Sequence, residues 1–228
     1  MTAIYLHGFA GHPSVWDGIM APGDGEAVAL PGHGDGGGDV RPTWAENLDA
    51  IAARAEGARV AVGYSLGARV ALGLLATGRV DRAILVGVNP GLADDGERAA
   101  RRERDARWAQ LLRARGIAAF ADAWQAQPLF ATQAHVAAER LAARRARRLA
   151  LDPEQLARSL EAMGLAEMPD YRAAITPGRV ALIAGALDEP YVAVAHTLPA
   201  GLVLIPDSGH DPTLEQPAAL AAVIASLI

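Results

Sequence analysis

Short, mostly apolar runs alternate with longer helical segments along this chain, and the alternation limits the folds open to it. The runs occupy residues 3–6, 27–30, 59–62, 83–86, 180–184 and 202–205. Runs of four or five such residues are typical of buried strands. Strands that alternate with helices form mostly parallel sheets with helices on both faces. We therefore expect an α/β fold.

The alternation breaks between the fourth and fifth expected strands. Residues 97–164 carry no strand pattern and predict three or four helices. The chain leaves the sheet there at the carboxyl end of a strand, which is where open α/β sheets bind ligands. We therefore expect an α/β core made of residues 1–90 and 169–228, with a helical lid at residues 91–168.

A Gly-x-Ser-x-Gly motif occupies residues 63–67, directly after the third expected strand and before a helix. In this context the serine lies on a tight, strained turn, so small neighbours are needed. The turn presents the hydroxyl, and the helix N-terminus adds a positive field. The motif predicts Ser65 as a nucleophile or base. The alternative is a serine that only caps the helix.

A serine hydroxyl needs a base, and His210 is the best candidate among six histidines because it follows the last expected strand. Asp188 follows the fifth strand and lies between Ser65 and His210, which gives the order serine, acid, histidine. A carboxylate there would fix the histidine tautomer. Asp207 and Asp211 compete, but each would have to fold back across a tight turn to reach the ring.

Two backbone N–H groups are expected to form an oxyanion hole. One belongs to Leu66, and the other to Phe9 in the loop after the first strand. We expect His7 to hold that loop in place. The sequence has no cluster of metal ligands and no phosphate-binding glycine motif, so no metal or cofactor is expected.

The distribution of charge suggests the kind of ligand. The chain carries a formal net charge of −5 and no lysine, but residues 91–168 hold 13 arginines against 11 acidic residues. The rest of the chain holds 8 arginines against 15 acidic residues. An acidic protein is a poor nucleic-acid binder, so a small anionic substrate is the expected partner.

Length and composition bound the remaining possibilities. A chain of 228 residues, half of them apolar, is long enough for one domain with a sizeable core. The absence of cysteine excludes disulfides and cysteine nucleophiles. No stretch approaches the roughly 20 apolar residues that span a membrane, and the N-terminal segment lacks signal-peptide features. We expect a cytoplasmic protein that does not enter membranes.

These motifs together resemble the α/β-hydrolase superfamily over nearly the whole chain. The segment at residues 89–109 and the Trp-x-x-Gln-Pro-x-Phe run at residues 124–130 resemble the lid of a narrower family. That family is the 2-succinyl-6-hydroxy-2,4-cyclohexadiene-1-carboxylate synthases of menaquinone biosynthesis. Arg69, four residues after Ser65, also fits it.

The resemblance implies an elimination rather than a hydrolysis. Pyruvate would be lost from 2-succinyl-5-enolpyruvyl-6-hydroxy-3-cyclohexene-1-carboxylate, and Ser65, activated by His210, would take a ring proton. Arginines would bind the substrate carboxylates. Carried over by position, the substrate-binding residues are Tyr64, Arg69, Arg101, Trp124 and Arg145, with Arg144 as the alternative to Arg145.

A serine carboxylesterase or lactone hydrolase with the same triad is the alternative function. An esterase pocket should be mostly apolar, whereas the lyase needs converging arginines. A binding protein without catalysis is disfavoured, because all three triad positions carry functional residue types.

Overall fold

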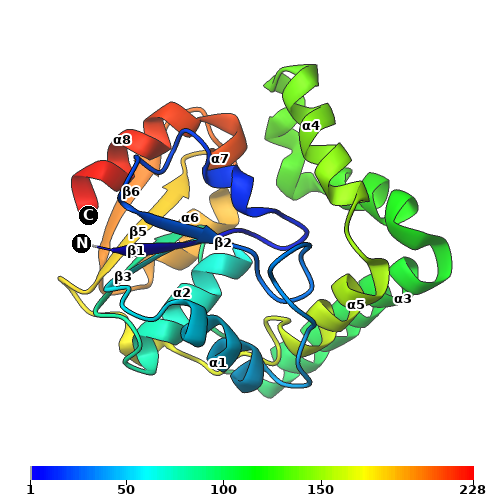
Figure 1. The fold of residues 1–228 in the computed structure, drawn as a ribbon, viewed down its shortest axis with the longest axis horizontal. Helices are drawn as coiled ribbons and strands as arrows, with labels where there is room; N and C mark the ends of the chain where they lie inside the picture. The colour runs from blue at the N-terminus through cyan, green and yellow to red at the C-terminus, as the bar shows by residue number, and fades with distance from the viewer. Residues whose placement is uncertain (1) are drawn as a thin grey trace.

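Six parallel strands form the centre of the molecule in a computed structural model that describes residues 2–228 (Figure 1). The strands are β1 (Ala3–Leu6), β2 (Gly25–Val28), β3 (Val60–Tyr64), β4 (Arg82–Val86), β5 (Val180–Gly185) and β6 (Gly201–Ile205). They pair in the order β2-β1-β3-β4-β5-β6, and every pairing is parallel. The predicted α/β fold with a parallel sheet is confirmed.

The helices of the described residues fall into two groups: some cover the faces of this sheet, and others lie beyond the carboxyl ends of its strands. The α-helices are α1 (Trp44–Arg54), α2 (Leu66–Ala76), α3 (Asp95–Gln125), α4 (Ala138–Leu149), α5 (Pro153–Ala162), α6 (Glu189–His196), α7 (Pro212–Glu215) and α8 (Pro217–Leu227). Three short 3₁₀ helices, η1 (Pro13–Trp16), η2 (Pro128–His135) and η3 (Arg172–Ala174), complete the elements. None of the helices formed by residues 2–228 is both long and apolar enough to span a bilayer.

Alternating side chains on the strands build two separate cores. In β1, Ile4 and Leu6 belong to a core shared with α1, α2 and α6. Ala3 and Tyr5 belong to the opposite core, which α8 and Trp16 of η1 close. A strand sends successive side chains to opposite faces, so both faces are buried (Figure 1).

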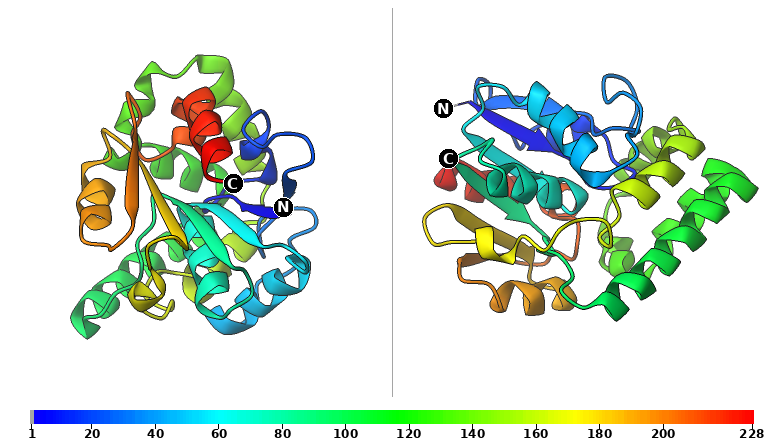
Figure 2. Two further views of the ribbon diagram at one scale, coloured as in Figure 1. Left: turned by 90° about the vertical axis from the view of Figure 1, so that its left-hand side faces the viewer. Right: turned by 90° about the horizontal axis from the view of Figure 1, so that it is seen from below.

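Four helical elements, α3, η2, α4 and α5, lie between β4 and β5 in the sequence, and we call residues 95–162 the helical insertion. The insertion stands at one side of the sheet, beyond the carboxyl ends of the strands (Figure 2). It contributes most of a third apolar core, which includes Leu112, Phe120 and Leu156 and also Ala10 from the loop after β1. Gly116 breaks α3 with a φ of 72° and a ψ of −178°, so the helix bends there.

One strand begins and ends earlier than the sequence suggests. We expect a strand at residues 27–30, and β2 spans Gly25–Val28 instead. The ladder stops because the N–H of Leu30 donates to Nε2 of His7 at 3.0 Å rather than to a neighbouring strand. At the start of β2, Gly25 lies so close to the carbonyl of Ala3 that a Cβ on residue 25 would overlap that carbonyl.

Candidate active site

Ser65 lies at the turn between β3 and α2 in a left-handed backbone conformation, with a φ of 53°. A side chain other than glycine rarely adopts this conformation, so the turn stores strain. Its N–H donates to the carbonyl of Val86 at 2.9 Å. A Cβ on Gly67 would overlap the carbonyl of Leu6, and one on Gly63 would overlap the carbonyl of Gly67. The motif therefore needs both glycines.

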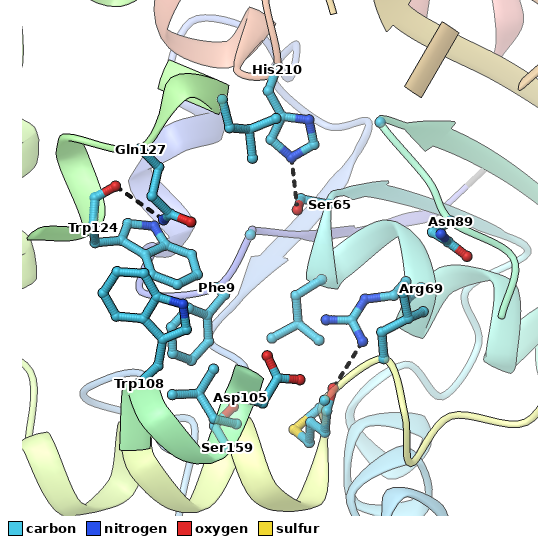
Figure 3. A pocket seen from close by; sticks show the side chains of 18 of the residues that line it. Phe9, Ser65, Arg69, Asn89, Asp105, Trp108, Trp124, Gln127, Ser159 and His210 are labelled. Atoms are coloured by element: carbon cyan, nitrogen blue, oxygen red, sulfur yellow. Dashed lines mark hydrogen bonds between the residues drawn. The ribbon is translucent and has the colours of Figure 1, made fainter. Parts of the chain in front are cut away.

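Ser65, His210 and Asp188 converge at the carboxyl edge of the sheet. Figure 3 shows the imidazole of His210 pointing toward Ser65. Nε2 of His210 lies 3.1 Å from Oγ of Ser65, and Nδ1 lies 2.7 Å from Oδ2 of Asp188. With the Nδ1 proton donated to the carboxylate, Nε2 is left to accept the proton of the serine hydroxyl. His210 and Asp188 are buried, which excludes water from their contact.

The two competing carboxylates take other positions. Asp211 accepts from Nη1 of Arg144 at 2.6 Å and from the N–H of Leu214 at 3.2 Å, so its charge is directed away from the imidazole. Asp207 lies exposed on the turn that follows β6. The structure thus brings Asp188, and neither competitor, to the ring of His210.

The side chain of Glu215 holds the loop that carries His210 through two hydrogen bonds. A carboxylate oxygen of Glu215 accepts from the N–H of Gly209 at 2.7 Å, and the other accepts from Asp211 at 3.2 Å. Gly87 has a φ of 61°, and a Cβ there would lie 3.1 Å from Cε1 of His210. A glycine at this position leaves the imidazole room to face Ser65.

Phe9 and Leu66 line the cavity beside Ser65. Within the part of the chain that the structure describes, neither N–H donates to another protein atom. His7 fixes the loop that carries Phe9, because its Nε2 accepts from the N–H of Leu30 and its Nδ1 donates to the carbonyl of Gly8 at 2.8 Å. Burial holds the pKa of His7 well below its usual value, so the ring is neutral and can serve as this acceptor.

A cavity of about 320 Å³ opens above these groups and receives residues from the sheet and from the helical insertion. Of the substrate-binding residues expected from sequence, Tyr64, Arg69, Arg101 and Trp124 line it. One wall is aromatic, since the ring centroid of Trp124 lies 5.1 Å from those of both Phe9 and Trp108 (Figure 3).

Three arginines, Arg69, Arg101 and Arg104, line the same cavity, beside one carboxylate, that of Asp105. Nη1 of Arg69 donates to the carbonyl of Met163 at 3.0 Å. Burial, followed by the charge of Arg101, lowers the pKa of Arg69 to about 10, so it stays charged at neutral pH. Arg104 is exposed at the cavity and forms no ion pair with any residue from 2 to 228. The cavity is therefore cationic beside the serine.

The structure does not bring Arg145 to this cavity. Arg145 is exposed and pairs with Asp122 at 2.7 Å, and the alternative, Arg144, pairs with Asp211. Arg148, one turn after Arg144 on α4, is buried at 7% exposure. Together with Arg144 it lines a smaller cavity that shares Phe9 and Tyr64 with the larger one.

Arg148 has weak partners for a buried cation. Its Nε lies 3.5 Å from the carbonyl of Ala10, and its Nη1 lies 3.4 Å from Oε1 of Gln125. It has no carboxylate within ion-pair distance among the described residues, and burial lowers its pKa to about 10. Sequence reasoning missed Arg148, although Leu141, Arg144 and Arg148 share one helix face by their spacing.

The fold and this strand–serine–helix turn define an enzyme class. Residues 3–223 match the model of the alpha/beta hydrolase family, and the chain belongs to that family. Within it, the chain is 32% identical to the 2-succinyl-6-hydroxy-2,4-cyclohexadiene-1-carboxylate synthase of Enterobacter sp. (strain 638), over 99% of this chain and 90% of the relative. The resemblance seen in the sequence is confirmed.

Solved structures show the same fold. MenH from S. aureus superposes with a TM-score of 0.91 at 24% identity, covering 100% of this chain and 92% of that one. A thermophilic esterase from Thermogutta terrifontis superposes with a TM-score of 0.80 at 24% identity, covering 99% and 88%. Enzymes with different reported activities thus share this architecture, and the residues of the cavity have to discriminate between them.

Proposed function

We propose that this chain is a lyase that eliminates pyruvate from 2-succinyl-5-enolpyruvyl-6-hydroxy-3-cyclohexene-1-carboxylate, giving 2-succinyl-6-hydroxy-2,4-cyclohexadiene-1-carboxylate. The observation that carries the proposal is the set of guanidinium groups around the Ser65–His210 pair. Arg69, Arg101 and Arg104 line the cavity that holds the serine. The similarity to the Enterobacter synthase supports the same assignment.

The names of substrate and product define the bonds that change. The 3-ene becomes a 2,4-diene and the 5-enolpyruvyl group leaves, so the ring loses a proton from C2, beside the succinyl carbonyl. The electron pair forms the C2–C3 double bond, the old double bond moves to C4–C5, and the C5–O bond breaks. The leaving group takes up a proton and becomes pyruvate, so the reaction needs no oxidant and no water.

The triad supplies the base for this step. Ser65 Oγ takes the C2 proton while its own proton passes to Nε2 of His210, 3.1 Å away. Asp188, 2.7 Å from Nδ1, stabilises the imidazolium that forms. Negative charge develops on the succinyl carbonyl oxygen, and the N–H groups of Phe9 and Leu66 are placed to receive it.

The charges of the site suit a substrate with three carboxylates. Arg101 donates to Asp105 through Nε, at 3.0 and 2.8 Å, so its terminal nitrogens are available for a bidentate contact. Arg69, which is half-buried, and Arg148, which is buried, contribute two more cations. In this assignment Arg148 takes the place that the sequence suggested for Arg145.

The helical insertion acts as a lid in this proposal. Its residues Arg101, Trp108 and Trp124 form the side of the cavity opposite the sheet. A closed aromatic wall excludes water, which strengthens the electrostatic contacts inside and protects the intermediate charge.

Ester or lactone hydrolysis is the alternative, because the same triad can form an acyl-enzyme and the esterase of Thermogutta terrifontis shares the fold. The cationic lining of the cavity favours the lyase, since a neutral ester gains nothing from three arginines around the serine.

The test is to incubate the purified protein with the enolpyruvyl substrate and to measure pyruvate with a coupled dehydrogenase, beside a p-nitrophenyl ester. We expect pyruvate release that depends on Ser65, with Ser65→Ala reducing kcat by about a thousandfold or more. Rapid ester turnover with no pyruvate would contradict the lyase and support the hydrolase.

A further inference from the structure

Tyr191 lies against the catalytic histidine without belonging to the triad. It is on the first turn of α6, which begins directly after Asp188. Its ring centroid lies 4.3 Å from that of His210, with an interplanar angle of 41°. The same side chain lines the cavity of about 320 Å³ that holds Ser65. Tyr191 is therefore placed to contact both the base and a bound substrate.

The phenol of Tyr191 has an unused hydrogen-bonding capacity. Its hydroxyl makes no hydrogen bond to any of residues 2–228. Tyr171 is different, because its hydroxyl accepts from Nε1 of Trp44 at 3.0 Å. A tyrosine hydroxyl that faces a cavity ordinarily finds a partner, and here the cavity is the place where a partner can enter.

The charges around Tyr191 point to the chemistry of that partner. Arg69 and Arg101 line the same cavity as Tyr191. Burial raises the pKa of the phenol above its ordinary value; Arg101 and Arg69 oppose that rise, and Asp188 and Asp105 add to it. Asp188 is held by His210 and Asp105 by Arg101, so neither carboxylate is available to the phenol. The phenol therefore keeps its proton at neutral pH and acts as a donor. A group that two guanidinium ions and one hydroxyl donor would bind together is a carboxylate.

We propose that Tyr191 is a further substrate-contacting and positioning residue. Its hydroxyl donates to a substrate carboxylate that Arg69 and Arg101 also bind, and its ring holds the imidazole of His210 in line with Ser65. The inference rests on the proposed function, because it names a contact within the same site.

The positioning part of the proposal rests on the packing of the imidazole. Three rings surround His210, with centroid distances of 4.3 Å to Tyr191, 5.5 Å to Tyr64 and 6.4 Å to Phe130. Tyr191 is the nearest of the three, and its aromatic face favours the imidazolium that forms when the serine gives up its proton. The ring and the hydroxyl thus have separable roles.

Two substitutions separate these roles. Tyr191→Phe keeps the ring, so we expect KM for the enolpyruvyl substrate to rise about tenfold, the effect of losing one hydrogen bond to a charged group, with kcat within about threefold. Tyr191→Leu removes the ring as well, so kcat should also fall about tenfold. Tyr171→Phe is the matched control, and it should change neither constant.

A second measurement does not depend on turnover. Binding of tricarballylate, a simple tricarboxylate, is measured by calorimetry on wild type, Tyr191→Phe and Tyr171→Phe. We expect about tenfold weaker binding for Tyr191→Phe alone. Equal affinities in all three proteins would overturn the proposed contact, even if wild type releases pyruvate.

The two proposals fail in different ways. Normal pyruvate release by wild type with an unchanged KM in Tyr191→Phe sinks only the role of Tyr191. Absence of pyruvate release with a clear loss of tricarballylate binding in Tyr191→Phe sinks only the lyase. Failure of Tyr191→Leu to lower kcat below that of Tyr191→Phe overturns the positioning role of the ring.

Discussion

Asp105 holds Arg101 through Nε alone, with its two carboxylate oxygens 3.0 and 2.8 Å from that atom. The carboxylate is buried between α3 and the end of α5, where a Cβ on Gly164 would lie 2.7 Å from Oδ2. Because the buried carboxylate fixes Nε of the guanidinium, it also sets the direction in which the two terminal nitrogens point. The two residues therefore act as one unit, in which Asp105 sets the direction that Arg101 presents to a ligand.

The first prediction concerns this orientation. Asp105→Asn keeps the shape but loses the charge, so Arg101 should become mobile. KM for the anionic substrate should rise about tenfold with little change in kcat. Steady-state kinetics on the folded variant measure the changes in KM and kcat. Glu103→Gln, which breaks the exposed Arg107–Glu103 pair on the same helix, is the control. Equal effects of the two substitutions would show that Asp105 has no special role.

The second prediction distinguishes the arginines of α4. Arg148→Met should raise KM for the tricarboxylate by more than tenfold, whereas Arg145→Met and Arg147→Met, at exposed positions, should leave it unchanged. The midpoint of thermal unfolding should stay the same or rise in Arg148→Met, because a buried and poorly paired cation is removed. Loss of affinity in Arg145→Met instead would restore the assignment made from sequence.

The third prediction concerns the turn at the serine. Gly67→Ala puts a methyl group into the carbonyl of Leu6, and neither backbone segment can move without disturbing β1 or α2. We expect the free energy of unfolding to fall by about 3 kcal/mol or more. Gly201→Ala is the control, because a Cβ there meets open space. Urea unfolding of the two variants measures the difference, and similar midpoints would contradict the steric argument.

The fourth prediction is a pH dependence of stability. Burial lowers the pKa of His33 to about 4, and its Nδ1 donates to the carbonyl of Pro31 at 2.9 Å. The unfolded chain binds a proton at His33 below about pH 6.5, while the folded chain does not until about pH 4. Stability should therefore fall as the pH is lowered across this window, by about 3 kcal/mol from this residue.

Urea titrations at pH 7.5, 6.0 and 4.5 measure that loss. His33→Gln cannot take up the proton, so its stability should depend less steeply on pH, although it should be less stable at pH 7.5. The burial of His7 acts in the same direction and leaves a residual slope in the variant. A variant with the same pH slope as wild type would show that His33 is not the source.

Local sequence signals predicted most of the framework. The strand expected at 3–6 is observed as β1, Ala3–Leu6, and the strand expected at 83–86 is observed as β4, Arg82–Val86. Hydrophobic runs and turn residues act over a few positions, so they can be read directly. The end of β2 could not be read, because a distant side chain, His7, takes the N–H of Leu30.

The residues of the site also fall into those that local sequence signals predict and those that depend on contacts between distant segments. Ser65, Asp188 and His210 follow strand ends, and strand ends are visible in a sequence. Whether Arg148 or Arg145 lies beside Phe9 and Tyr64 depends on which side of α4 faces the sheet. That orientation is set by packing between segments far apart in the chain, so counting positions along a helix cannot decide it alone.

The separate apolar core of the helical insertion has a consequence for local unfolding. Because Leu112, Phe120 and Leu156 pack with one another rather than under the sheet, this region can open while β3 and β4 keep their hydrogen bonds. Amide protons of α3 and α5 should accordingly exchange with deuterium before those of the central strands. We expect the arginines carried by α3 to move away from the serine in that open state, while the central strands stay folded.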